Sequence, residues 1–213
     1  MKLSPAGFPL YIDLNHDGIN DFQLRTTYYA GSSGLELGLG ASGIADNQVA
    51  GRRFRSSGGY FFSAASALPA GAQIGPKGNF SVRFPFMAME IFNRDGGSQY
   101  FDLGPWAGKG KGVKNRYLGL KFVVDGEVHY GWARISVTLE HHRQSDDVIG
   151  TLTGYAYETI PNKSVKAGQE TEDADESATG PGETTPRAVP VPTAATLGML
   201  ARGAQALDLW RRE

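Results

Sequence analysis

The segment YLGLKFVVDG at residues 117–126 does most to decide the class of fold. Its first eight residues are rich in apolar, aromatic and β-branched side chains, which favour a strand. Asp125-Gly126 follows, a pair that favours the type I′ turn of a two-residue hairpin. Residues 127–139 then predict the return strand, with Trp132 among its apolar residues. The sequence therefore predicts an antiparallel β-hairpin here.

Shorter strand-like stretches surround this hairpin. Residues 151–159 alternate and predict a further strand, and weaker strands are expected at 35–39, 60–63, 79–86, 87–93 and 99–103. The chain has 29 glycines, and many short strands joined by Gly-rich turns are typical of a sandwich or barrel. No helical period is convincing before residue 193. The predicted fold class is all-β, a jelly-roll-like β-sandwich.

Residues 13–21, DLNHDGIND, form the stretch whose spacing points to a specific chemistry. Ca²⁺ takes six to eight oxygen ligands, and a loop with ligands at positions 1, 3, 5, 7 and 9 supplies most of them. The predicted calcium ligands are the side chains, and at position 7 the carbonyl, of Asp13, Asn15, Asp17, Ile19 and Asp21. Gly18 stands where the chain must turn sharply. The alternative is a surface turn without metal, because Asn, Asp and Gly all favour turns.

The flanks of this stretch do not resemble those of an EF-hand. Position 12 of the loop would be Leu24, where an EF-hand has a bidentate Glu. Residues 8–12 and 22–26 have strand-like patterns rather than helical ones. The cation is therefore expected to bind at a turn between two strands.

Composition divides the chain into three parts. Residues 1–161 are expected to form a calcium-binding β-sandwich domain. Residues 162–192 are acidic and poor in large apolar side chains, so a disordered linker is expected. Residues 193–213 are expected to form a short helical tail with the layout of a sorting signal. Insertion of Arg202 or Asp208 near a bilayer centre would cost about 2.5–3.5 kcal/mol each. An amphipathic helix is therefore the alternative to a membrane span for this tail. Membrane contact, if there is any, is expected through this tail only.

Charge and residue usage exclude several functions. The formal net charge is −1, so nothing global points to nucleic acid. The absence of cysteine excludes disulfides, zinc–thiolate sites and thiol nucleophiles. Neither a G-x-S-x-G nor an H-E-x-x-H motif occurs, and no catalytic residue is assigned. A glycoside-active enzyme stays an alternative, since its two carboxylates can be far apart in sequence.

Residues 108–116 form a glycine-rich basic stretch that lacks the P-loop spacing. Contact with an anionic polymer such as an acidic polysaccharide would use Lys109, Lys111, Lys114 and Arg116. The alternative is a mobile solvated loop. A carbohydrate-binding module would need a stacking platform of aromatics such as Tyr28-Tyr29, Tyr60-Phe61-Phe62 and Trp106, although in an all-β core most aromatics simply pack.

Three segments together resemble bacterial exported proteins with a PEP-CTERM sorting signal. They are DLNHDG at 13–18, YLGLKF at 117–122 with HYGWAR at 129–134, and GYAYETIP at 154–161 followed by a spacer and the tail. In the tail, Val191 stands between two prolines where the family has Glu. The resemblance implies an exported protein of the cell surface or extracellular matrix.

These observations lead to one functional hypothesis: a non-enzymatic, calcium-stabilised, secreted or cell-surface protein with a structural role. No signal peptide is visible, so the mature start or an upstream start is expected. Millimolar calcium outside cells fits a weak loop of this kind. Residues 1–7 could pair with the sheet edge of a neighbouring copy. The expected partner is therefore a second copy of the chain, bound by strand pairing. Binding of acidic polysaccharide is the alternative.

Overall fold

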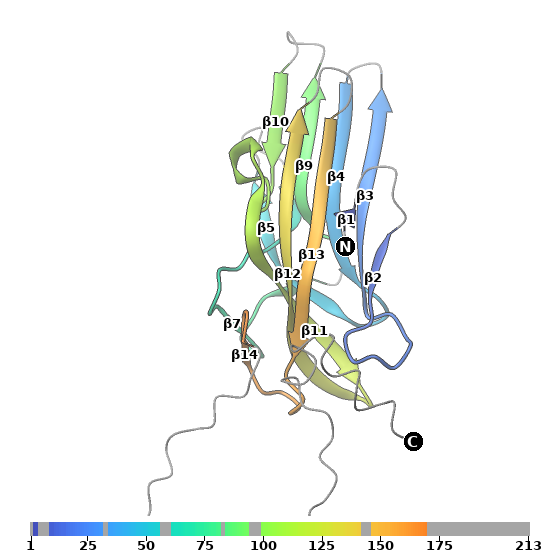
Figure 1. Cartoon of the computed structure of the whole chain (residues 1–213), viewed down its shortest axis with the longest axis vertical. Helices are drawn as coiled ribbons and strands as arrows, with labels where there is room; N and C mark the ends of the chain where they lie inside the picture. Colours follow the sequence, from blue (N-terminus) through green and yellow to red (C-terminus); the bar gives the residue numbers. More distant parts are fainter. Residues whose placement is uncertain are drawn as a thin grey trace, which may run out of the picture. The chain divides into compact units, whose positions relative to one another are not determined.

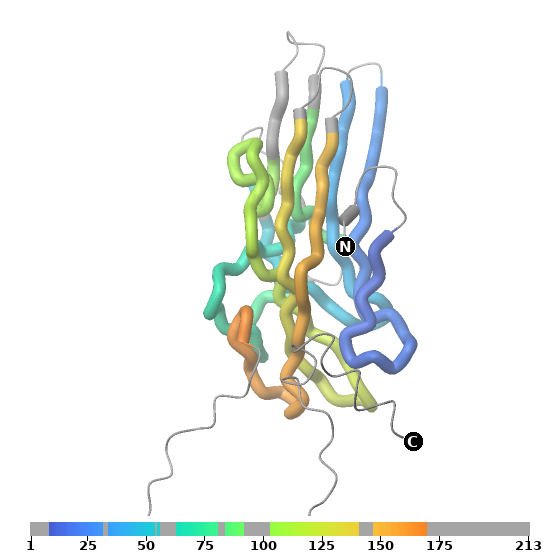
Figure 2. The backbone as a smooth tube through the Cα atoms, viewed as in Figure 1, coloured from blue at the N-terminus to red at the C-terminus, as the bar shows by residue number. Residues whose placement is uncertain are grey.

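The computed structural model describes residues 2–3, 9–31, 34–55, 61–81, 84–93, 99–141 and 146–169 (Figures 1 and 2). These residues form β-strands almost throughout, which confirms the all-β prediction. Within these ranges, none of the helical structure is long and apolar enough to cross a bilayer. The helix expected within 193–213 lies outside the described residues.

The strands follow one another along the chain with one short 3-10 helix among them. They are β1 (Lys2–Leu3), β2 (Leu10–Ile12), β3 (Phe22–Gly31), β4 (Gly34–Gly43), β5 (Gln48–Arg55), β6 (Phe61–Ala65), β7 (Gln73–Ile74), β8 (Phe80–Ser81), β9 (Phe86–Asn93), β10 (Gln99–Leu103), η1 (Gly108–Gly110), β11 (Val113–Val124), β12 (Glu127–His141), β13 (Asp146–Tyr157) and β14 (Val165–Lys166).

Twelve of these strands belong to one hydrogen-bonded sheet. Its order is β1-β13-β12-β11-β5-β6-β9-β4-β3-β2, with β10 added beside β9 and β8 beside β5. The sheet curls so that β13 comes against β4, where a side chain added at Gly150 would lie 3.1 Å from Leu39. The path is thus continuous rather than divided into two separate sheets, and the jelly-roll sandwich stays a prediction.

The hairpin predicted from residues 117–126 is present. β11 and β12 pair from Val113↔Val137 to Val124↔Glu127, with a bulge near the start of β11. Asp125 and Gly126 have φ angles of 52° and 83°, and the type I′ turn requires positive φ at both positions. β13 then adds beside β12, which makes this three-stranded meander the most extensively paired part of the sheet.

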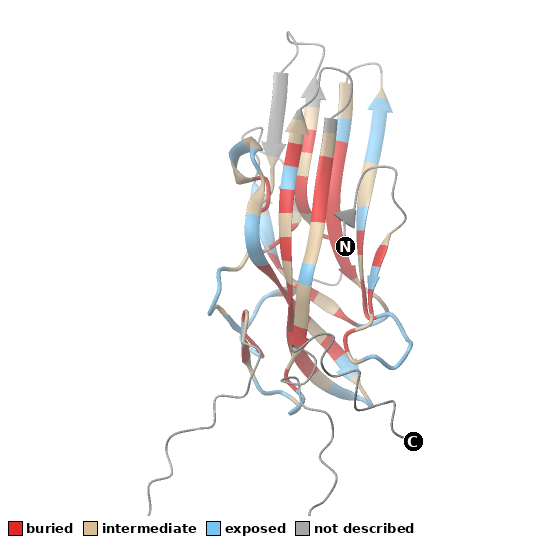
Figure 3. Ribbon diagram, viewed as in Figure 1, coloured by how far each residue is buried: buried red, intermediate tan, exposed pale blue. Residues whose placement is uncertain are grey.

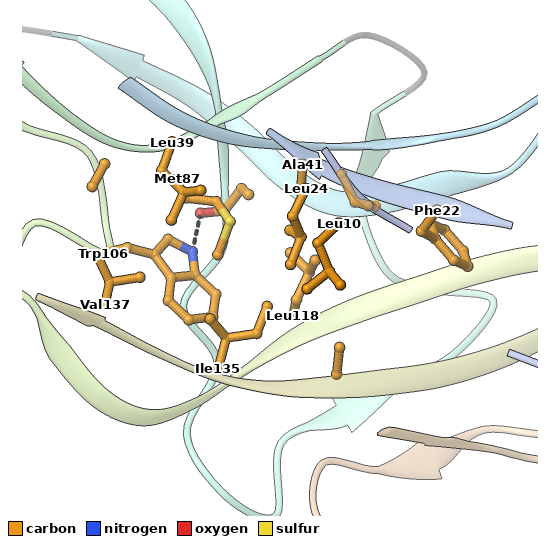
Figure 4. Packing of buried hydrophobic residues seen from close by; sticks show 14 of the residues in the cluster. Leu10, Phe22, Leu24, Leu39, Ala41, Met87, Trp106, Leu118, Ile135 and Val137 are labelled. Carbon is orange, nitrogen blue, oxygen red and sulfur yellow. Dashed lines mark hydrogen bonds between the residues drawn. The ribbon is translucent and has the colours of Figure 1, made fainter. Parts of the chain in front are cut away.

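The core lies between the curled halves of the sheet, and continuous stretches of buried residues run along β4 and β11 (Figure 3). Trp106 is fully buried among Leu39, Met87 and Ile135, and its Nε1–H donates to the Ala65 carbonyl at 3.1 Å (Figure 4). Trp106 is therefore a packing residue, which corrects its place among the candidate sugar-stacking aromatics.

The compact unit extends to Gly168 rather than ending at Pro161. β14 pairs with β7 through Val165↔Ile74, and Val165 and Ala167 are buried. The expected linker therefore begins later than predicted. Val165 pairs with Ile74, and the Ala167 N–H donates to the Ala72 carbonyl, so both residues belong to the folded unit. Its remainder from 170 onward lies outside the described residues.

The N-terminal strand pairs within its own chain. Lys2 lies opposite Thr151 and Leu3 opposite Gly150, so β1 forms one end of the strand path while β2 forms the other. For these two residues the structure differs from the expectation that residues 1–7 reach a neighbouring copy. The physical reason is that the edge of β13 offers them unpaired backbone groups close at hand.

Candidate metal-binding turn

The turn predicted to bind calcium joins β2 to β3. The strands on either side pair at Ile12↔Phe22, as the flanking patterns indicated. The side chain of Leu14 is buried in the core, whereas residues 16–20 are exposed. The turn is visible as the blue loop below β2 and β3 (Figure 1). It is thus an exposed loop fastened to the core at both ends.

Backbone N–H groups of the turn gather its oxygen-bearing side chains. The Asp13 carboxylate accepts from the N–H of Asp17 at 3.2 Å and from that of Gly18 at 2.9 Å. Asp17 accepts from the N–H of Ile19 at 2.7 Å, and the Asn15 Nδ2 donates to Asp17 at 3.0 Å. Asp13, Asn15 and Asp17 are therefore brought together within one turn, and Ile19 joins it through its backbone.

Two residues of the turn have left-handed backbone. Gly18 has φ 87° and His16 has φ 63°. No atom lies within 4 Å of a Cβ built on Gly18, so its requirement is conformational and not steric. The glycine thus stands at the sharp bend that the sequence predicted.

Asp21 lies at the base of the turn and points inward. Its side chain is 7% exposed, and its Oδ2 accepts from the Leu14 N–H at 2.8 Å. Burial raises the pKa of this carboxyl, and the charges of Asp17 and Asp13 raise it further. The three carboxylates therefore repel one another in the absence of a cation.

Asn47 connects this base to a distant strand. Its Nδ2 donates to the Asp21 Oδ1 at 3.2 Å and to the Asp21 carbonyl at 3.3 Å, while its Oδ1 accepts from the Val123 N–H at 3.0 Å. A Cβ on Gly43 would meet the Asn47 carbonyl at 1.7 Å, so only glycine allows this approach. The sequence analysis did not identify Asn47.

Two tyrosines of β13 lie beside the turn. The rings of His16 and Tyr155 have centroids 5.9 Å apart. Burial raises the pKa of Tyr155, with a further contribution from the charge of Asp13, and burial together with Asp21 does the same for Tyr157. These residues were predicted only as members of a strand, yet they form the wall against which the turn sits.

The residues present fit calcium in part. Each carboxylate oxygen has more than one lone-pair site, so Asp13 and Asp17 keep acceptor capacity beyond the backbone bonds that orient them. Within the described ranges, however, no three His, Asp or Glu side chains converge as a metal-holding group. Asp21 already accepts hydrogen bonds from Leu14 and Asn47 and is buried, whereas Asp13 is half-buried and Asp17 is exposed.

The predicted polyanion-binding residues all lie on the surface. Lys109 is in η1 with φ 59°, Lys111 follows it, and Lys114 and Arg116 are in β11. Asn115, with φ 50°, sits at the bulge in β11 and its N–H donates to the Ser136 hydroxyl at 3.0 Å. The bulge interrupts the alternation, so residues 114–116 are all exposed.

His129 has a structural role. It is buried against Phe122 and Tyr157, and its Nδ1 lies 2.9 Å from the Glu158 carbonyl oxygen. Glu158 in turn forms an ion pair with Lys163 at 3.2 Å.

Comparison of the chain with protein-family models, curated proteins and solved structures finds no match. The turn and the surfaces described above are therefore the basis for a proposal about its function.

Proposed function

We propose that the chain is a non-enzymatic, calcium-stabilised β-sheet protein with a structural role at the cell surface or in the extracellular matrix. The observation that supports it is the turn at 13–21, where backbone hydrogen bonds hold Asp13, Asn15 and Asp17 together above the buried Asp21. The resemblance to exported PEP-CTERM proteins supports the location, which stays a prediction.

The electrostatics of the turn explain what a cation would do there. Burial raises the pKa of Asp21, and the charges of Asp17 and Asp13 raise it further, so the three negative charges oppose one another in the folded chain. A divalent cation bound by the exposed oxygens would reverse that effect and favour the folded state. Because both β2 and β3 begin or end at this turn, ordering it would also fix the edge of the sheet.

Calcium is expected to raise the melting temperature by a few degrees. A ligand that binds only the folded state stabilises it by RT ln(1 + [L]/Kd), and a Kd of roughly 10⁻⁴–10⁻³ M at about 1 mM calcium gives about 0.4–1.4 kcal/mol. Differential scanning calorimetry with calcium and with EGTA measures this shift. Asp17→Ala should abolish it, while Asp125→Asn, in the exposed β11–β12 turn, should keep it. Identical melting curves in calcium and EGTA for the native chain would contradict the proposal.

Terbium offers a second readout that does not depend on stability. Tb³⁺ replaces Ca²⁺ at oxygen sites, and its luminescence is sensitised by a nearby aromatic side chain. Tyr155 lies beside the turn, in contact with His16. Excitation of the tyrosines should therefore produce Tb³⁺ emission that excess calcium displaces. Tyr155→Phe should reduce the emission without changing the calcium concentration needed for displacement.

A second candidate function is binding of acidic polysaccharide. It is favoured by the β11 bulge, which leaves residues 114–116 exposed close in sequence to Lys109 of η1 and to Lys111. Replacing Lys109, Lys111, Lys114 and Arg116 by Gln should weaken binding to polygalacturonate about fourfold or more, since exposed ion pairs contribute roughly 0.2–1 kcal/mol each. Isothermal titration at low and high salt measures this. Lys77→Gln, an exposed lysine elsewhere, is the control, and equal binding by all variants would exclude these residues.

A further inference from the structure

The outer edge of β3 is only partly covered. β2 pairs with Phe22, Gln23 and Leu24, while β4 pairs with β3 along its whole length. Among the residues that the structure describes, no strand pairs with the outer edge of 25–31. This part of β3 is pale blue and tan, and the neighbouring β4 is buried from residue 37 to residue 42 (Figure 3). Within the described ranges, an edge of seven residues thus carries backbone groups without a strand partner.

Tyr28 is an exposed residue on the core-facing side of this edge. It lies directly opposite Leu37, and residues opposite each other in an antiparallel pair share a face. Leu37 is 2% exposed and belongs to the core, whereas Tyr28 is 64% exposed. The core-facing side therefore continues to the end of the sheet, where an aromatic side chain is left in solvent.

The edge lacks the features that normally block strand addition. Proteins protect such edges with Lys, Pro, inward-pointing charges or bulges. Residues 26–31 read Thr-Thr-Tyr-Tyr-Ala-Gly, without charge or proline, and the β3–β4 register is regular throughout. Thr and Tyr also favour strands. The segment is therefore suited to accept a further strand.

We propose that this edge pairs with the same edge of a second copy, antiparallel and centred on Tyr28. In that register Tyr28 lies opposite Tyr28 of the second copy, Thr27 opposite Tyr29, and Thr26 opposite Ala30. Aromatic pairs and aromatic–Thr pairs are favourable across strands. The two sheets then form one sheet across the dimer, and the row formed by Leu37 and Tyr28 continues into its counterpart.

The charge pattern of this edge is compatible with a second copy as the partner. Arg25 is the one charged residue of 25–31. The register places it opposite Gly31 of the second copy, which carries no charge. No like charges therefore meet along the pairing, as a symmetric interface requires. The proposal does not depend on calcium, because the turn at 13–21 lies at the other end of β3 from Tyr28.

Sedimentation velocity over a range of protein concentrations, in calcium and in EGTA, tests the proposal. The native chain should dimerise in both. Tyr28→Lys and Tyr28→Glu should each raise the dimer dissociation constant at least about tenfold, because like charges then face each other across the axis. An equimolar mixture of the two variants should recover dimers, since Lys then faces Glu.

Tyr11→Lys is the matched control, because Tyr11 is exposed on the neighbouring strand β2 but outside the pairing segment. It should dimerise as the native chain does. Circular dichroism and thermal melting verify that all variants fold. A native chain that stays monomeric at high concentration would overturn the proposal, and so would a mixture of the Lys and Glu variants that associates no better than either alone.

Discussion

Replacing Trp106 by alanine is expected to lower the free energy of unfolding by about 3–5 kcal/mol, the range for removing a large aromatic side chain from a core. The indole is 0% exposed and fills space between Leu39, Met87 and Ile135 (Figure 4). Its backbone N–H also donates to the Met87 carbonyl at 3.1 Å, so the loop that carries it is fixed to β9. The neighbouring strands cannot collapse fully into the cavity because each is paired in the sheet.

A second variant separates packing from hydrogen bonding at this position. Trp106→Phe keeps most of the apolar volume but leaves the Ala65 carbonyl without its donor, which should cost about 1–3 kcal/mol. As a control, Tyr11→Ala removes an aromatic side chain that is 48% exposed and should stay within about 1 kcal/mol of the native chain. Urea unfolding measures all three variants. A Trp106→Ala variant as stable as Tyr11→Ala would contradict the placement of the indole.

The local signals in the sequence predicted the meander well and the curl of the sheet poorly. The β11–β12 hairpin follows from one apolar run and a two-residue turn, both visible within 117–126. β5 was not predicted as a strand, since Arg52, Arg53 and Arg55 leave it without a clear apolar alternation. Yet β5 pairs with β11 through Val49 and with β6 through residues 51–55, so it carries the path from one half of the sheet to the other. That role depends on partners far apart in sequence.

The candidate site shows the same limit. The turn could be recognised because its oxygen-bearing residues all fall within nine positions, and Gly18 has the positive φ that its place indicated. Asn47 could not be recognised, since it meets Asp21 from 26 positions away and Val123 from 76. A single Asn beside a Gly-rich strand carries no local pattern that distinguishes it from an ordinary turn residue.

Asn47→Ala is expected to destabilise the fold by about 2–4 kcal/mol, because it removes several buried hydrogen bonds at once. The buried Asp21 would lose the donor to its Oδ1, and the Val123 N–H would lose its acceptor. Each buried polar group left without a partner costs about 1–3 kcal/mol. The affinity of the turn for calcium should fall as well, since Asp21 would no longer be held in place. Urea unfolding and Tb³⁺ titration measure the two effects.

Asn47→Asp distinguishes the hydrogen bonds of this residue from its volume. The new carboxylate could still accept from the Val123 N–H, but its other oxygen would face the Asp21 carboxylate, whose pKa burial already raises. Two facing carboxylates cannot both ionise at low cost, so this variant should be unstable at neutral pH and recover as the pH falls and a proton is shared. Ser42→Ala, which alters a buried polar residue of β4, should show no such recovery. If Asn47→Asp were as stable as the native chain at neutral pH, Asn47 would not act as the donor to the Asp21 carboxylate, and the Leu14 N–H would be left to hold that side chain.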